Sequence, residues 1–461
     1  MKTRRILSVF LLVVLIFSFH AVPVALADET NAPVLPEDPN ILAKAALLVD
    51  VETDTIVYGK HENDQLYPAS LTKVMTALLV LDAIEDGKLS MEQEVTASET
   101  AFAGLSADGS NAGIKVGEIM TVRNLLYCML VVSANEACQI LAEAVSGSVE
   151  AFVAEMNARA IKLGCQNTHF VNPHGYHDPD HYTSAWDMYL ITKAAMEYEG
   201  FMTICDTAHV VIPATNLRKE RDYWTTNHLL STWRVVGYRN SEAHGIKTGS
   251  TDDAGHCLIS SSQRGNLHFV SVILGAERVE ENGVGNIRSF SETTRLFNYG
   301  FDNFTYQTVI AEKDPVQEVA VTLSEIDRVV VSAAEDTVVL MPKGLKPEHL
   351  KRTVTLIENP VEAPVTAGTK MGTLDLSHDG KVYATVDLLA MHDVEASEMM
   401  IFMRDAKEFI TRPIVKIAAL AVLALIVLIV VWRLLLSRRR YRYGRSVSRG
   451  HGHNYRGRRK Y

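Results

Sequence analysis

The amino-acid sequence predicts a mixed α/β protein of the α+β type, with a domain of helices and strands, a small β-rich domain and a membrane-spanning helix. Three observations support this class. Apolar residues recur at helical spacing between residues 70 and 163, and β-rich runs follow between 245 and 275. Short alternating segments separated by turn residues fill 306–391. The late apolar run 417–432 carries no charge, which indicates a membrane segment.

The first 27 residues have the features of a secretory signal peptide. A basic start precedes an apolar run over 6–19, and Ala25-Leu26-Ala27 forms a small-residue cleavage site. A retained signal anchor is the alternative. Residues 28–40 are rich in proline, and we expect them to form a linker. The sequence therefore predicts an exported protein.

The domain expected over residues 41–305 begins with a hairpin and continues into helices. Pro68 fits a helix entrance, and apolar residues at 74, 77, 78 and 81 share one helix face. Gly164 is a suitable cap after the last of the three following helices. The strands after residue 244 are expected to be adjacent and antiparallel. The expected strands are 45–50, 55–58, 245–251, 257–260 and 269–275, and the expected helices are 70–81, 122–132, 136–145, 149–163 and 291–299.

The chain beyond residue 305 changes to short β segments. Their alternation predicts a small β-sandwich domain over 306–392. A linking helix over 393–412 then leads into 413–436, where flanking lysine and arginine stems can snorkel and extend the apolar run to a full membrane span. Residues 437–461 are rich in arginine and contain no acidic residue, so the positive-inside rule predicts a cytoplasmic tail. Nucleic-acid binding by this tail is the alternative.

The formal net charge of −10 conceals an uneven distribution. The signal peptide and the segment from Arg433 onward are both basic, so the exported part carries roughly −24. Such an acidic surface does not favour a polyanion, and we expect no nucleic-acid partner. We expect a single-pass protein of the cell membrane, with the folded domains outside.

The five cysteines are scattered and form no Cys-x-x-Cys pair, so neither a zinc site nor a disulfide framework is expected. We interpret them mainly as buried small hydrophobic residues, with one disulfide left open. The segment 172–181 contains several His and Asp residues, but its two prolines and its glycine indicate a structural turn. A metal site is the alternative there; we expect no metal and no cofactor.

Ser70 and Lys73 are the first candidate pair for chemistry. Residues three apart in a helix are neighbours, so the lysine amine can touch the serine hydroxyl. An amine with a lowered pKa can take the proton of a serine and make it a nucleophile. Taken alone, the pair also fits a helix start with a solvated lysine. Two later segments, Ser133-Ala134-Asn135 and Lys247-Thr248-Gly249, alone fit a helix cap and a surface strand.

These three motifs in this order resemble the penicillin-recognising serine enzymes. The flanking sequences narrow the resemblance to the serine D-alanyl-D-alanine carboxypeptidases, the low-molecular-mass penicillin-binding proteins, over about residues 42–301. The segments that carry it are Tyr67-Pro68-Ala69-Ser70-Leu71-Thr72-Lys73, Leu141-Ala142-Glu143, Phe152-Val153-Ala154-Glu155-Met156-Asn157, Asn172-Pro173-His174-Gly175 and Ala254-Gly255-His256-Cys257.

This resemblance implies a β-lactamase-like catalytic domain, in which an antiparallel sheet is flanked by helices. It implies removal of the terminal D-alanine from peptidoglycan stem peptides, inhibition by β-lactams, and a catalytic domain followed by the family's C-terminal domain. Two departures are the Ser-Ala-Asn form of the middle motif and Arg288-Ser289-Phe290, where relatives often have arginine directly before phenylalanine. Arg288 is therefore only a suggested ligand of the substrate carboxylate, and we do not count it among the site residues.

The resemblance also implies a role for each site residue. Ser70 is the nucleophile, Lys73 its base and Ser133 the group that passes a proton to the departing amine. A β-lactamase, a transpeptidase or endopeptidase, and a wall-bound scaffold with a silenced site are the alternatives. The residues expected to bind substrate are Asn135, Lys247, Thr248, Gly249 and, through its backbone N–H, Ser250.

Overall fold

The computed structural model describes residues 33–281 and 284–442, so the predicted signal peptide and most of the basic tail lie outside the described residues. The described chain divides into two compact units. The first contains the residues up to Gln307 together with Val338–His349, and the second contains Thr308–Thr337 and the residues from Leu350 onward.

The first unit is built on a five-stranded sheet with the order β2-β1-β9-β8-β7. Each neighbouring pair is antiparallel, as expected for both the N-terminal hairpin and the later strands. Where the observed strands differ from the predicted ones, they mainly extend a few residues further. The bounds are β1 Ala45–Asp50, β2 Thr55–Lys60, β7 Ala243–Thr251, β8 Gly255–Arg264 and β9 Leu267–Ala276.

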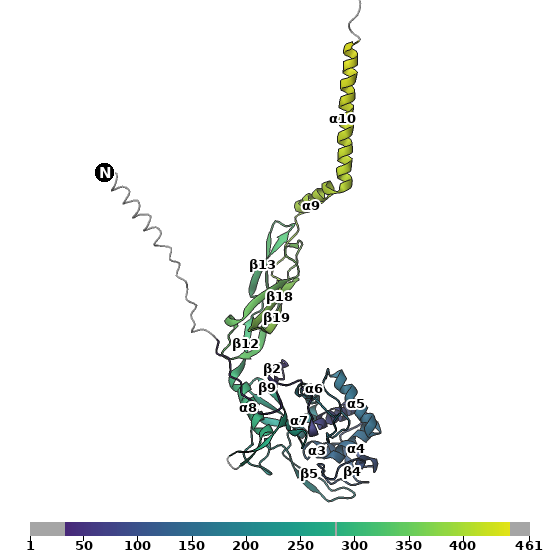
Figure 1. The fold of residues 1–461 in the computed structure, drawn as a ribbon, viewed down its shortest axis with the longest axis vertical. Coiled ribbons are helices and arrows are strands. Elements are labelled where there is room, and N and C mark those ends of the chain that lie inside the picture. Colours follow the sequence, from purple (N-terminus) through teal and green to yellow (C-terminus); the bar gives the residue numbers. More distant parts are fainter. Residues whose placement is uncertain (1–32, 282–283, 443–461) are drawn as a thin grey trace, which may run out of the picture. The chain divides into compact units, whose positions relative to one another are not determined.

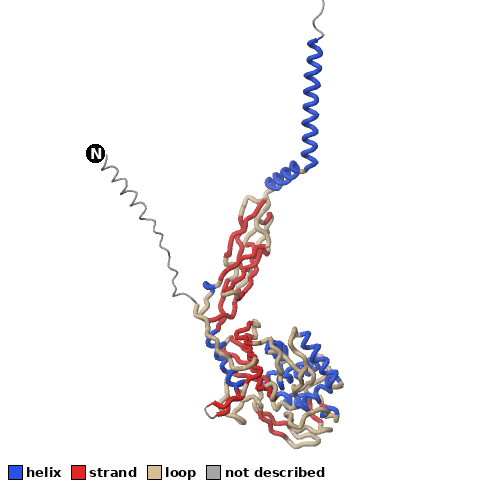
Figure 2. Tube along the Cα trace, in the orientation of Figure 1, coloured by secondary structure: helices blue, strands red, loops and turns tan. Residues whose placement is uncertain are grey.

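Both faces of this sheet are buried. Alternate residues of β1 contribute to two different cores, with Leu47 in one and Leu48 in the other. Helix α8 (Arg288–Asn303) packs on β8 and β9 from one side, and α6 (Ala185–Met196) packs on β1 and β9. In Figure 2 the strands of this unit gather beside its helices, and Figure 1 places α3, α4 and α5 together away from α8.

Helix α8 is longer than the predicted 291–299. The prediction ended it before Gly300, yet Gly300 lies inside the helix. A Cβ at Gly300 would lie 2.8 Å from the Phe269 ring and 2.9 Å from Leu48. The glycine therefore permits close packing of the helix on the sheet and does not terminate it.

The predicted helices between 70 and 163 are confirmed with small shifts: α2 Lys73–Glu85, α3 Val122–Leu130, α4 Asn135–Ser146 and α5 Val149–Lys162. Gly164 follows α5 with φ +88°. Helices α6 and α7 (Glu199–Cys205) were not predicted from the sequence. Further short elements are β3 Glu94–Thr96, η3 Thr100–Phe102, β4 Ile119–Thr121, β5 His209–Ile212, β6 Arg221–Trp224, β10 Arg278–Glu281 and β11 Val284–Ile287.

All five cysteines are free, and four of them are buried. Cys165 is the partly exposed one. The interpretation as small hydrophobic residues therefore fits the structure, and the disulfide left open by the sequence does not form.

The second unit contains the expected β-rich part. Its six-stranded sheet has the order β16-β18-β19-β14-β13-β17, with β13 and β17 parallel. A separate two-stranded sheet consists of β12 (Phe304–Ile310) and β15 (Thr337–Pro342). The start of β12, all of β15 after Thr337, and η4 (Pro347–His349) belong to the first unit. The strands of the larger sheet are β13 Pro315–Thr322, β14 Arg328–Ala333, β16 Lys351–Leu356, β17 Val361–Glu362, β18 Lys370–His378 and β19 Lys381–Ala390.

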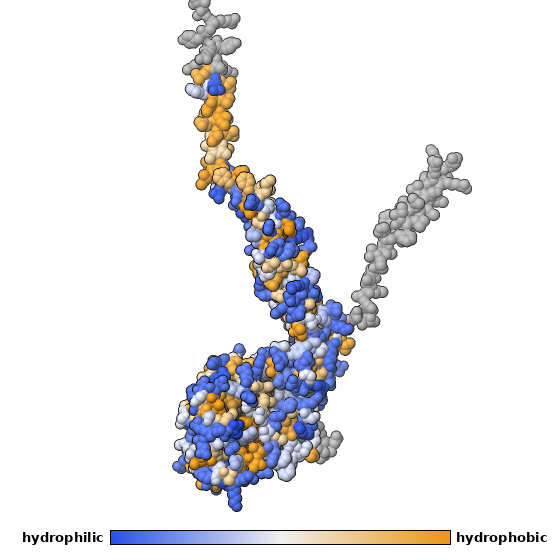
Figure 3. Space-filling model, turned by 180° about the vertical axis from the view of Figure 1, so that it is seen from behind, coloured by the Kyte–Doolittle hydropathy of each residue, from blue (hydrophilic) through white to orange (hydrophobic). Residues whose placement is uncertain are grey.

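Two helices follow the second sheet. α9 is Glu398–Thr411 and α10 is Pro413–Arg442. Within α10, the 24-residue segment Pro413–Leu436 contains an 18-residue stretch with a mean hydropathy of 3.2 and no burial, so this segment is long and apolar enough to cross a membrane. Its hydrophobic surface is visible in Figure 3.

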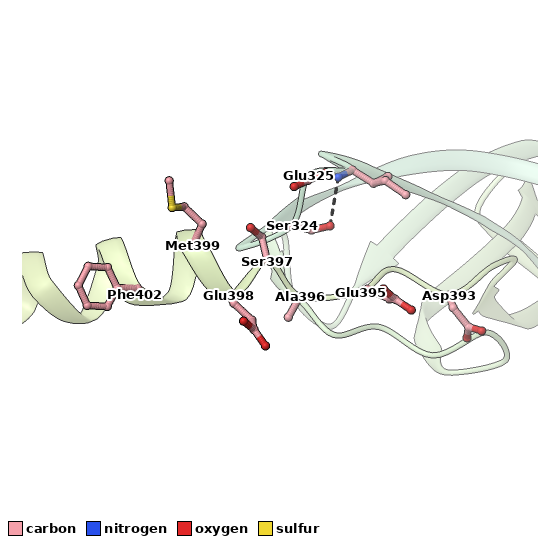
Figure 4. A pocket seen from close by; sticks show the side chains of 10 residues that line it. Ser324, Glu325, Asp393, Glu395, Ala396, Ser397, Glu398, Met399 and Phe402 are labelled. Atoms are coloured by element: carbon pink, nitrogen blue, oxygen red, sulfur yellow. Dashed lines mark hydrogen bonds between the residues drawn. The ribbon is translucent and has the colours of Figure 1, made fainter.

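A cavity of about 900 Å³ lies where α9 begins, bounded by Ser324–Ile326 and by Asp393–Phe402. Its lining combines acidic side chains with Met399 and Phe402 (Figure 4). The predicted catalytic residues are elsewhere, in the first unit.

Candidate active site

Ser70 lies in the 3₁₀ turn η2 (Ala69–Thr72), directly before α2. The preceding Ala69 has φ +48°, a left-handed conformation that is unusual for alanine. This turn is packed so tightly that a Cβ on Gly175 would lie 1.8 Å from the Ala69 carbonyl oxygen. The neighbouring loop thus supports the strained turn that presents Ser70 at a helix N-terminus.

Lys73 is the centre of the hydrogen-bond network. Its Nζ donates to Ser70 Oγ at 2.9 Å, to Asn135 Oδ1 at 2.8 Å and to the His174 carbonyl at 2.6 Å. An ammonium group has three protons, and these three acceptors account for all of them. The arrangement fixes the amine against the hydroxyl that it is expected to deprotonate.

The electrostatic environment favours a neutral amine. Lys73 is 0% exposed, and burial lowers its pKa to about 8, while the negative charge of Glu136 acts in the opposite direction. A lysine with this pKa is partly neutral near pH 7 and can accept a proton.

Ser133 and Asn135 lie in the turn that joins α3 to α4. Ser133 has φ +70°, and its side chain is almost completely buried. Asn135 is the first residue of α4, and its amide oxygen faces Lys73. A Cβ on Gly109 would lie 2.7 Å from the Asn135 amide nitrogen, so Gly109 covers this side chain closely. The turn brings the middle motif to the amine of Lys73.

The third motif lies on β7. Lys247 is 1% exposed, and its Nζ donates to the Thr248 carbonyl at 3.0 Å. Burial, followed by the nearby charge of Lys73, lowers the pKa of Lys247 to about 7. The sheet therefore holds a second lysine near the first, as the sequence predicted.

Gly249 has a structural function that the sequence did not indicate. A Cβ there would lie 2.9 Å from the Pro68 carbonyl oxygen and 3.1 Å from the Ser70 backbone nitrogen. The sequence analysis placed Gly249 among the residues expected to bind substrate. In the structure the closest neighbour of this glycine is the turn that carries the serine.

A cavity of about 320 Å³ opens at Ser70. Three predicted residues line it: Ser70, Asn135 and Ser250. Lys73 and Lys247 are buried, and Thr248 is half-buried. The other lining residues are Asp108, Gly109, Ser110, Gly175, Tyr176, His177, Thr251, Asp252 and Asp253.

The 172–181 loop acts as a support for this site. The His174 carbonyl accepts from Lys73, and His181 shares a 2.8 Å hydrogen bond with Thr72. Burial lowers the pKa of both histidines to about 3, so they are neutral. Among residues 33–281 and 284–442, no group of three His, Cys, Asp or Glu side chains is arranged to hold a metal ion.

Arg288 begins α8, and its guanidinium lies 3.9 Å from the Glu277 carboxylate. It is not among the residues that line the Ser70 cavity. The suggested role in binding substrate therefore receives no support from this geometry.

Sequence reasoning also missed Thr226, whose hydroxyl lies 2.6 Å from that of Thr248.

Comparison with known proteins identifies the family. The profile described as D-alanyl-D-alanine carboxypeptidase matches residues 32–278. This chain belongs to the D-alanyl-D-alanine carboxypeptidase family. A second profile, the C-terminal domain of penicillin-binding protein 5, matches residues 304–396.

Relatives within the D-alanyl-D-alanine carboxypeptidase family cover most of the chain. The carboxypeptidase DacF of Bacillus subtilis is 30% identical, over 87% of this chain and 97% of its own length. DacC of Escherichia coli is 31% identical, over 82% and 90%. The crystal structure of penicillin-binding protein 5 from Haemophilus influenzae has a TM-score of 0.61 at 29% identity, covering 78% of this chain and 99% of that protein. The expected family and fold class are thereby confirmed.

Proposed function

We propose that this carboxypeptidase removes the terminal D-alanine from peptidoglycan pentapeptide stems through an acyl-enzyme on Ser70. One observation carries the proposal: the buried Lys73 amine donates to the Ser70 hydroxyl at 2.9 Å. A serine next to a base of lowered pKa is the arrangement that nucleophilic catalysis requires. Membership of the family supports the substrate class.

In the acylation step, neutral Lys73 takes the Ser70 proton, and Ser70 Oγ attacks the carbonyl between the two D-alanines. The backbone N–H groups of Ser70 and Ser250 then donate to the developing oxyanion. The close approach of Gly249 to the Ser70 nitrogen supports this assignment, because Ser250 follows Gly249 on the same strand.

In the following steps, the proton that Lys73 took from Ser70 passes by way of Ser133 to the amine of the departing D-alanine, and water then hydrolyses the acyl-enzyme and returns a proton to Ser70. Lys247 and Thr248 bind the free carboxylate of the substrate, while Asn135 orients Lys73 and the substrate backbone. β-Lactams acylate the same serine and act as inhibitors. This scheme uses no metal or cofactor.

We further propose that the protein is a single-pass protein of the cell membrane, with the catalytic domain outside and residues 437–461 in the cytoplasm. The apolar span Pro413–Leu436 supports the anchor, and the arginine-rich tail supports the orientation. α9 exposes Met399, Phe402 and Phe409, which suit a position at the membrane surface. The proposed domains are 41–305 for catalysis and 306–392 for the β-rich domain.

The decisive experiment incubates the full chain in detergent with a pentapeptide stem and measures free D-alanine. We expect release by the wild type and a loss of more than about a thousandfold in Ser70→Ala, together with loss of covalent penicillin labelling. Ser90→Ala, at an exposed serine, is the matched control and should behave as wild type. Retained release in Ser70→Ala would overturn the proposal.

The product pattern separates the alternatives. Rapid turnover of penicillin would identify a β-lactamase, because a carboxypeptidase forms a long-lived adduct. Cross-linked or cleaved dimeric muropeptides would identify a transpeptidase or an endopeptidase. Absence of any product from wild type, with the chain folded, would indicate a silenced site.

A further inference from the structure

Thr226 lies beside the third catalytic motif although it belongs to none of the three. Its hydroxyl is 2.6 Å from the Thr248 hydroxyl, and it comes from the segment between β6 and β7. This is a short hydrogen bond between two neutral groups. The contact joins a residue of no assigned function to a predicted ligand of the substrate carboxylate.

The segment around Thr226 is fixed at three points. The backbone N–H of Thr225 donates to the Ala208 carbonyl at 2.9 Å, and that of Thr226 donates to the Val131 carbonyl at 3.2 Å. The buried Asn227 side chain donates to the Gly245 carbonyl at 2.5 Å. Hydrogen bonds of Thr225, Thr226 and Asn227 therefore fix the backbone around Thr226, and its hydroxyl has a defined position.

These contacts link the two sides of the active site. Val131 follows α3, two residues before Ser133, whereas Thr248 lies on β7. Thr226 contacts Val131 through its backbone N–H and Thr248 through its side-chain hydroxyl. It thus couples the strand that carries the third motif to the turn that carries the middle motif.

The two hydroxyls contain two protons, but the bond between them uses only one. Whichever threonine donates, one hydroxyl proton stays available to a further acceptor. A hydroxyl that already takes part in a hydrogen bond is polarised and becomes a better donor. The pair therefore retains one hydroxyl proton for a further acceptor, and Thr248 adjoins Lys247 on β7, where the proposed function places the substrate carboxylate.

We propose that Thr226 is a positioning residue for the substrate carboxylate, because its hydroxyl orients Thr248 as a donor to that group. The inference rests on the proposed function, since it takes Thr248 as the ligand of the terminal carboxylate. It predicts an effect on binding of the carboxylate and leaves the Ser70–Lys73 chemistry unchanged.

The test compares Thr226→Val, which keeps the shape and removes the hydroxyl, with Thr226→Ser, which keeps the hydroxyl. We expect KM for a D-Ala-D-Ala peptide to rise about tenfold in Thr226→Val, with kcat within about twofold of wild type. Thr226→Ser should restore KM. Thr207→Val, whose hydroxyl bonds a helix carbonyl outside the site, is the matched control.

A double variant distinguishes positioning from general damage. If Thr226 acts through Thr248, adding Thr226→Val to Thr248→Val should raise KM no further. Additive increases of KM in the double variant would overturn the inference. A roughly tenfold loss of kcat with unchanged KM in Thr226→Val would also overturn it. Failure of the proposed function is separate, because it would appear as D-alanine release by Ser70→Ala.

Discussion

Gly249 of β7 lies against Ser70, so closely that a Cβ on the glycine would be 3.1 Å from the serine backbone nitrogen. The nearest atom, the Pro68 carbonyl oxygen at 2.9 Å, belongs to the backbone and cannot rotate away. The position of the nucleophile therefore depends on the absence of a side chain on the facing strand.

Gly249→Ala should reduce the rate of penicillin acylation by about a hundredfold, because displacement of Ser70 from its base misaligns the attack. Labelling with a fluorescent penicillin measures this rate, and thermal unfolding checks that the variant is folded. Gly200→Ala is the control, since its added Cβ meets only the flexible end of Met91. A Gly249→Ala enzyme with wild-type acylation would show that the close approach has no catalytic importance.

The acylation rate should increase with pH through the titration of Lys73. Its pKa is lowered to about 8, and the base must be unprotonated, so only about a tenth of the molecules are active at pH 7. At saturating penicillin, which removes the effect of binding, the rate should rise tenfold per unit below pH 8 and level off above it. A rate independent of pH between 6 and 9 would contradict Lys73 as the base.

The charge of Glu136 gives a control for this pH profile. Glu136 raises the pKa of Lys73, so Glu136→Gln should lower it and move the rising limb to lower pH. The glutamine can still accept from the Ala112 and Ile114 backbone, as the carboxylate does at 2.7 and 3.3 Å. A shift to higher pH would assign the limb to another group.

Arg221 and Glu118 form a buried ion pair at 2.6 Å, with side chains 8% and 0% exposed. Arg221→Met should lower the free energy of unfolding by about 3–5 kcal/mol, because it leaves a buried carboxylate without its cation. Chemical denaturation of the detergent-solubilised chain measures the loss. Adding Glu118→Gln should recover part of it; equal stability of wild type and Arg221→Met would contradict the prediction.

Helix α3 is an element that the sequence pattern predicted well. Helix α3 has its apolar residues on one side, and the periodicity located it within two residues. Helix α6 was missed because it is buried nearly all round and contains Asp187 and Thr192 among its buried residues. Such a helix has no polar stripe to define its period.

The active site was predictable as far as its motifs extend. Ser70, Lys73 and Asn135 come together as the order of the motifs indicated. The supporting contacts were not predictable, because they come from backbone atoms and single residues far away in sequence. The segment with His174 and Gly175 was recognised as a turn, but nothing in it indicated the contacts with Lys73 and Ala69, and the Thr226 hydroxyl has no local sequence pattern.

The buried free cysteines can report when the folded protein opens. Burial raises the pKa of Cys128 to about 12 and that of Cys138 and Cys257 to about 11, so almost no thiolate is present at neutral pH. Alkylating reagents should consequently spare these sulfurs until the core opens, and the labelling rate then counts opening events. Folding of the first unit also needs no disulfide-forming oxidant or disulfide isomerase, since its cysteines are all free.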